Sequence, residues 1–71
     1  MRKLPHYAYR ILWSERDGEC VAVCDELPEL SGLGATPTAA IRQLETAIAP
    51  WLDYLAAHGI GAPVPARRSA R

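Results

Sequence analysis

Residues with the chemistry of a catalytic site are few in this sequence. Its two histidines, His6 and His58, lie near opposite ends of a chain of 71 residues. Nucleophilic catalysis needs a nucleophile, a base and an orienting group held together, and neither histidine has an obvious relay partner. The two histidines also lack the spacing of zinc ligands. We therefore expect no catalytic residue, no metal ligand and no cofactor.

The two cysteines, Cys20 and Cys24, are four positions apart in a segment typical of a strand. Such residues lie on one face of the strand at about 13 Å, whereas bridged cysteines keep their Cα atoms within about 7 Å. An internal disulfide is excluded by this geometry. We predict two buried or half-buried free thiols.

Carboxylates gather in one short connection, at Asp25, Glu26 and Glu29. No acids from other elements accompany them, so a solvated acidic loop is favoured over paired-carboxylate chemistry. A minimal nuclease that uses Asp25 or Glu26 is the least supported alternative. Gly32 and Gly34 precede a predicted helix, as in phosphate-binding loops, but the third glycine and the lysine of such motifs are missing.

Size and charge narrow the class of protein further. The chain has room for one domain with a thin core, for which self-association into a dimer or tetramer is a common remedy. Eight basic and eight acidic residues cancel, so no overall field favours nucleic acid or a membrane. No apolar run is long enough to cross a bilayer, and we expect a cytoplasmic protein. We assign residues 1–65 to a single domain and 66–71 to a disordered basic tail.

The hydrophobic pattern predicts a hairpin at the start of the chain. Large apolar residues alternate over 7–13, which is the period of a strand with one core face. Asp17 and Gly18 supply turn chemistry, and residues 19–24 form the return strand. Both faces of that strand are apolar, so we place it at the centre of the sheet.

A third strand and one helix complete the predicted elements. Pro28 interrupts strand pairing, and a short strand follows over 30–35. Thr36 and Pro37 are a strong helix start. The apolar stripe that covers the sheet comprises Ile41, Leu44, Ile48, Trp51, Leu52 and Leu55. Because the stripe stays in phase past Pro50, we expect a kink there, not a helix end. A short extra edge strand over 60–65 is left open.

Aromatic residues are the best candidates for a binding surface. The complete set is Tyr7, Tyr9, Trp13, Trp51 and Tyr54. Most should pack between sheet and helix, but Tyr and Trp are enriched at interfaces, and five in so small a domain leave some for a partner or oligomer contact.

The order of these motifs resembles the HicB-like antitoxin family. The segments that carry the resemblance are Tyr9-Arg10-Ile11 with Trp13 and Asp17-Gly18, then the run 21–32 around Leu27-Pro28-Glu29-Leu30, and Gly34-Ala35-Thr36-Pro37. Together they span about Tyr7 to Pro65. The resemblance implies an α+β, partial RNase H-like fold: three antiparallel strands with a helix across one face.

The same resemblance implies a function without catalysis. Family members typically pair with HicA, a small mRNA-cleaving toxin, and neutralise it by masking its active surface. Longer members add a C-terminal DNA-binding domain that this sequence lacks, so we expect no specific operator binding. A stand-alone oligomeric HicB-like domain, with a regulatory or scaffold role and no toxin, is the alternative.

Overall fold

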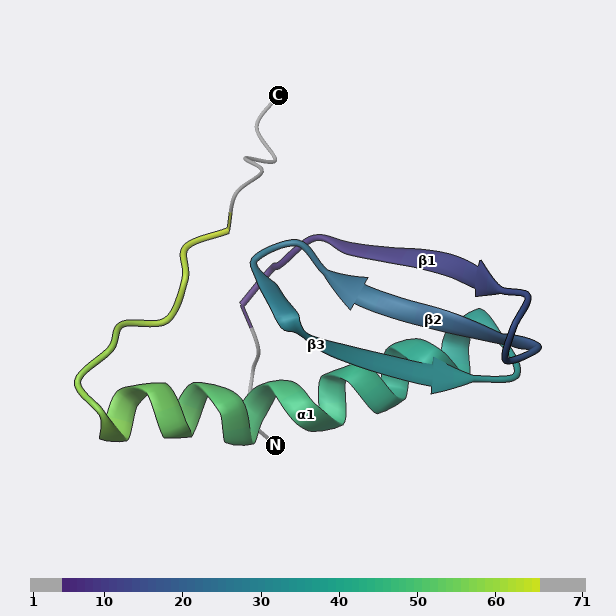
Figure 1. The fold of residues 1–71 in the computed structure, drawn as a ribbon. Helices are drawn as coiled ribbons and strands as arrows, with labels where there is room; N and C mark the ends of the chain where they lie inside the picture. The colour runs from purple at the N-terminus through teal and green to yellow at the C-terminus, as the bar shows by residue number, and fades with distance from the viewer. Residues whose placement is uncertain (1–4, 66–71) are drawn as a thin grey trace, which may run out of the picture.

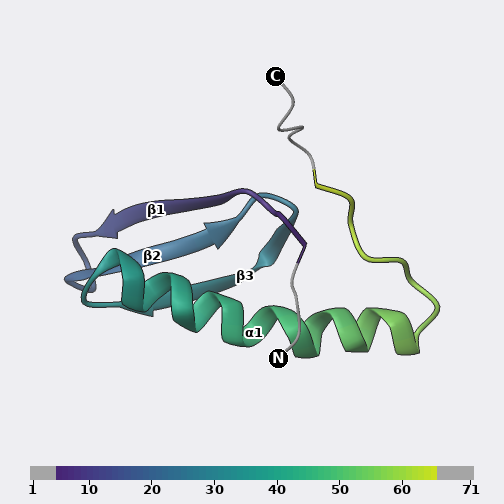
Figure 2. The same cartoon turned by 180° about the vertical axis from the view of Figure 1, so that it is seen from behind.

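The computed structural model describes residues 5–65, which form a three-stranded antiparallel sheet with one long helix on one face. The elements are β1 (Tyr9–Ser14), β2 (Glu19–Cys24), β3 (Leu27–Gly34) and α1 (Pro37–Ala57). The strand order is β1-β2-β3, which confirms the central position of β2 and the α+β class. Figure 1 shows α1 running along the sheet beside β3, and Figure 2 shows both layers from behind.

The core lies between α1 and the face of β2 that carries alternate small residues. Ala22 and Cys24 are buried there, and both cysteines are free thiols, as predicted. Gly32 of β3 lies opposite Ala22, and a methyl group at Gly32 would collide with the backbone of α1 at Ala40 and Leu44. The buried helix residues are Ala40, Leu44, Ile48 and Leu52. Small residues on the sheet therefore let the helix approach closely.

Helix α1 begins and ends where the sequence predicts. The Thr36 hydroxyl accepts a hydrogen bond from the amide of Ala39 at 3.1 Å, and Pro37 occupies the first turn. His58 caps the C-terminus and Gly59 follows with a φ of +73°, a conformation that glycine adopts without strain. Pro50 lies inside a continuous helix, so the prediction that it does not end the helix is confirmed.

The structure corrects two local predictions and decides one open alternative. Strand β1 does not bury its alternating face at Ile11 and Trp13, because α1 packs mainly over β2 and β3. Strand β3 begins at Leu27, which pairs with Cys24, and not at residue 30. The register then shifts across residues 28–30, so the predicted interruption of strand pairing at Pro28 is confirmed. Residues 60–65 contain no strand, since Pro63 and Pro65 offer no amide to a ladder. The predicted tail over 66–71 lies outside the described residues.

Candidate functional site

The structure divides the five candidate aromatic residues among three places. Tyr7 belongs to the core rather than to an exposed surface: its side chain is only 8% exposed, and its hydroxyl donates to the backbone oxygen of Pro63 at 2.6 Å. Tyr9 is half-buried beside the core. Trp13 is exposed on β1, whereas Trp51 and Tyr54 lie together on α1.

A polar cluster under the start of β1 joins Tyr7, Tyr9, Cys24 and Glu26. The Glu26 carboxylate accepts the amide of Ala8 at 3.1 Å and the Cys24 thiol at 3.7 Å. Burial, with smaller contributions that include the nearby Glu26 charge, raises the pKa of the Cys24 thiol. Burial also raises the pKa of Tyr7 and of Tyr9, and the Glu45 charge adds to the effect at Tyr9. A raised pKa disfavours the thiolate, which is the nucleophilic form of cysteine.

The acidic connection between β2 and β3 is engaged in structural contacts. The Asp25 carboxylate accepts a hydrogen bond from the Arg10 guanidinium at 2.8 Å, a pair exposed to solvent. Glu26 is held by the amide of Ala8. No group of three His, Cys, Asp or Glu residues within residues 5–65 is placed to hold a metal ion. These contacts fix the β2–β3 turn against the start of β1.

The first exposed apolar surface is the β1 strip, which we define as Ile11, Leu12 and Trp13. Their exposed fractions are 37%, 49% and 58%. Ile11 and Trp13 project to the α1 side of the sheet, opposite Ala22 and Cys20, while Leu12 projects to the open side. Large apolar side chains are therefore exposed on both faces of this edge strand.

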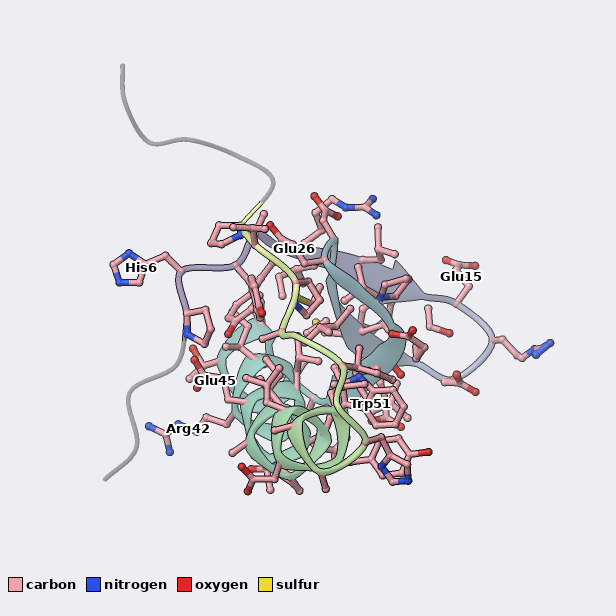
Figure 3. The ribbon with its side chains drawn as sticks, turned by 90° about the vertical axis from the view of Figure 1, so that its left-hand side faces the viewer. His6, Glu15, Glu26, Arg42, Glu45 and Trp51 are labelled. Atoms are coloured by element: carbon pink, nitrogen blue, oxygen red, sulfur yellow. The ribbon has the colours of Figure 1, made fainter. Side chains whose placement is uncertain are left out.

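The second surface is the α1 aromatic row, which we define as Trp51, Tyr54 and His58. The Trp51 and Tyr54 rings stack with centroids 5.2 Å apart, and the His58 ring lies 4.2 Å from Tyr54. Half-buried Trp51 anchors the row to the core, whereas Tyr54 is 49% exposed. Figure 3 shows Trp51 on one flank of α1 and Arg42 and Glu45 on the opposite flank. The row is an ordered aromatic surface with a polar tip on Tyr54.

Sequence reasoning missed two residues that shape these surfaces. Leu12 was hidden because the alternation in β1 assigned the core face to its neighbours. Gln43 accepts the amide of Leu33 at 2.6 Å and thereby closes part of the β3 edge. Nothing in the sequence marks Gln43 as an edge-capping residue, because a single glutamine on the polar side of a helix is ordinary.

The comparisons with known proteins add no relative. No family model, no curated protein and no solved structure matches the chain. Within residues 5–65, α1 is the only helix, and it lacks the long apolar stretch that crossing a membrane requires.

Proposed function

We propose that this domain is a binding module of the HicB antitoxin type, which neutralises a HicA-type mRNA-cleaving toxin by covering its active surface. The ordered sequence motifs from Tyr9 to Pro37 support this proposal. The sheet with one helix across a face is compatible with the partial RNase H-like fold that the resemblance implies.

The observation that carries the proposal is the α1 aromatic row. Tyr54 is half exposed, yet it is held between Trp51 and His58 by ring contacts on both sides. Aromatic side chains that are ordered before binding lose little conformational freedom on association, and Tyr and Trp dominate binding energy at interfaces. We assign the toxin contact to this row.

The polar groups of the domain favour binding over catalysis. The Cys24 thiol has a raised pKa, which disfavours the thiolate. Asp25 is paired with Arg10, and Glu26 accepts a backbone amide and the thiol. These residues stabilise the turn that carries them, and no reactive nucleophile results.

The alternative function, a stand-alone oligomeric scaffold without a toxin, is favoured by the β1 strip. An exposed apolar edge fits a contact between copies as well as a contact with another protein. The two functions differ in whether a second protein is required.

Co-purification tests the proposal. The tagged domain is expressed with the product of a small neighbouring gene, and the retained protein is identified by mass spectrometry. We expect a HicA-like protein whose toxicity is neutralised. Tyr54→Ala should weaken its capture about tenfold or more, which is the scale of an interface hot spot. Val64→Ala, at a more exposed apolar residue that is not part of the row, is the control and should leave capture unchanged.

Two results would contradict the proposal. Recovery of the domain alone would favour the oligomeric scaffold. RNA cleavage by the purified domain that is lost in Asp25→Asn would instead show a nuclease.

A further inference from the structure

The outer edge of β1 is the open edge of the sheet. Within residues 5–65, β1 pairs with β2 alone, and no strand lies on its other side. The edge carries Ile11, Leu12 and Trp13, and Arg10 is its only charged residue. Natural proteins usually protect such an edge with lysine, proline, a bulge or a covering element.

The other edge of the sheet has these protections. Pro28 has no amide to donate, and the register of β3 shifts beside it. The amide of Leu33 donates to the Gln43 side chain at 2.6 Å, so α1 itself occupies that edge. The contrast indicates that β1 is left open for pairing.

The pairing pattern shows which groups of β1 face outward. The amide of Asp25 donates to the Ala8 oxygen at 2.9 Å, so Ala8 and Asp25 form a hydrogen-bonded pair. Hydrogen-bonded and non-hydrogen-bonded pairs alternate along an antiparallel ladder. The amides and carbonyls of Tyr9, Ile11 and Trp13 therefore point away from β2, toward the open edge.

We infer that the outer edge of β1 pairs antiparallel with β1 of a second copy of this chain, joining the two sheets into one. Residues directly opposite each other project to the same face of a sheet. A two-fold axis between the strands must therefore pass midway between one residue and the same residue of the second copy. Near the middle of β1 that residue is Ile11 or Leu12. Both registers place the two α1 helices on the same face.

The composition of β1 and its hairpin fits this partner. With the axis at Leu12, Ile11 lies opposite Trp13 of the second copy. With the axis at Ile11, Tyr9 lies opposite Trp13 of the second copy. The exposed Ile11 and Trp13 side chains of both copies then meet between the two helices, forming an apolar centre.

The antiparallel direction brings the Arg10 end of each strand toward the hairpin of the other copy, where Glu15, Asp17 and Glu19 outweigh Arg16. Arg10 already pairs with Asp25 of its own chain at 2.8 Å, but its side chain remains 62% exposed, so its guanidinium can also reach a carboxylate of that hairpin. A polar rim then surrounds the apolar centre, as in other specific interfaces.

Analytical ultracentrifugation of the full chain, from low to high micromolar concentration, tests the inference. We expect a dimer, and we expect Leu12→Lys to weaken it about tenfold or more. With the axis at Leu12, the new lysine would lie opposite the same lysine of the second copy. With the axis at Ile11, it would lie opposite Arg10 of the second copy. Both arrangements bring like charges together. Leu33→Lys is the matched control, because Leu33 is similarly exposed on the same open face but belongs to β3. It should leave the dimer intact.

Amide hydrogen exchange keeps the test valid if Leu12→Lys fails to fold. In the wild-type dimer, the outward amides of Ile11 and Trp13 should exchange slowly and lose this protection on dilution. Three results would overturn the inference: a monomeric wild-type chain, rapid exchange at both amides, or equal weakening by the folded Leu12 and Leu33 variants. The last result would indicate contact through the open face. Toxin capture through Tyr54 is measured separately, so this failure leaves the proposed function standing.

Discussion

The hydroxyl of Tyr7 donates a hydrogen bond to the backbone oxygen of Pro63 at 2.6 Å, joining residues 56 positions apart. The bond ties the segment after α1 to the segment before β1, at the end of the sheet where that strand begins (Figure 1). The Tyr7 ring is part of the core. One side chain therefore both fills the core and holds both ends of the described chain.

Removing only this hydroxyl tests its contribution. Tyr7→Phe should lower the free energy of unfolding by about 0.5–1.5 kcal/mol, because the ring stays in place while one hydrogen bond is lost. Urea denaturation measures the change. Tyr54→Phe, at an exposed tyrosine, is the control and should change stability by less than about 0.5 kcal/mol. Equal stability of the two variants would show that the Pro63 contact contributes little.

The close approach of β3 and α1 at Gly32 predicts a large effect from one methyl group. A Cβ atom there would collide with the helix backbone at Ala40 and Leu44, which has little room to move. Gly32→Ala should destabilise the domain by about 1–3 kcal/mol or more. A Cβ atom at Gly61 would meet nothing within 4 Å, so Gly61→Ala is the control for thermal unfolding. A tolerated Gly32→Ala would mean that α1 lies farther from the sheet.

Leucines on the two faces of the sheet should differ in their contribution to stability. Leu44 is fully buried under β3, and Leu44→Ala should cost about 2–5 kcal/mol through lost contacts and a cavity. Leu33 is 41% exposed on the open face, so Leu33→Ala should cost less than about 1 kcal/mol. Chemical denaturation of both variants checks the difference. Similar costs would show that the open face is covered in solution.

Alkaline pH should destabilise the domain. The pKa values of Cys24, Tyr7 and Tyr9 are all raised in the folded state, chiefly by burial. Their contribution to stability is complete below the ordinary thiol value of 9.0 and falls as pH rises through the folded values, because the unfolded chain loses its protons first. Urea unfolding at neutral and alkaline pH measures this loss, and Cys24→Ala should reduce it. Stability that rises with pH would contradict these shifts.

The sequence predicts the strands and the helix of this fold well, but it predicts poorly which strands the helix covers. Alternation, the Asp17-Gly18 turn and the Thr36-Pro37 helix start are local signals, and the structure has the hairpin and helix that they predict. Exposure of Ile11 and Trp13 depends on where α1 lies across the sheet, which is a tertiary property. Alternation identifies two faces of a strand and does not show whether a single helix reaches both edge strands.

The sequence predicts which aromatic residues lie close together on the helix, but it does not predict which tyrosine is buried and which is exposed. The spacing of Trp51, Tyr54 and His58 places them on one side of a helix, so their proximity follows from the sequence. Tyr7 has the same aromatic character, but its burial depends on contact with Pro63 and the core. Side-chain type alone could not separate the tyrosine that holds the fold from the tyrosine that is exposed.

RNA cleavage by a HicA-type toxin, the partner that we propose for this domain, tests the central proposal most directly. The purified partner is mixed with increasing amounts of this domain, and cleavage of an RNA substrate is followed over time. We predict that cleavage stops near equimolar amounts of wild-type domain and persists at the same amount of folded Tyr54→Ala. Undiminished cleavage at a large excess of folded wild-type domain would contradict an antitoxin role.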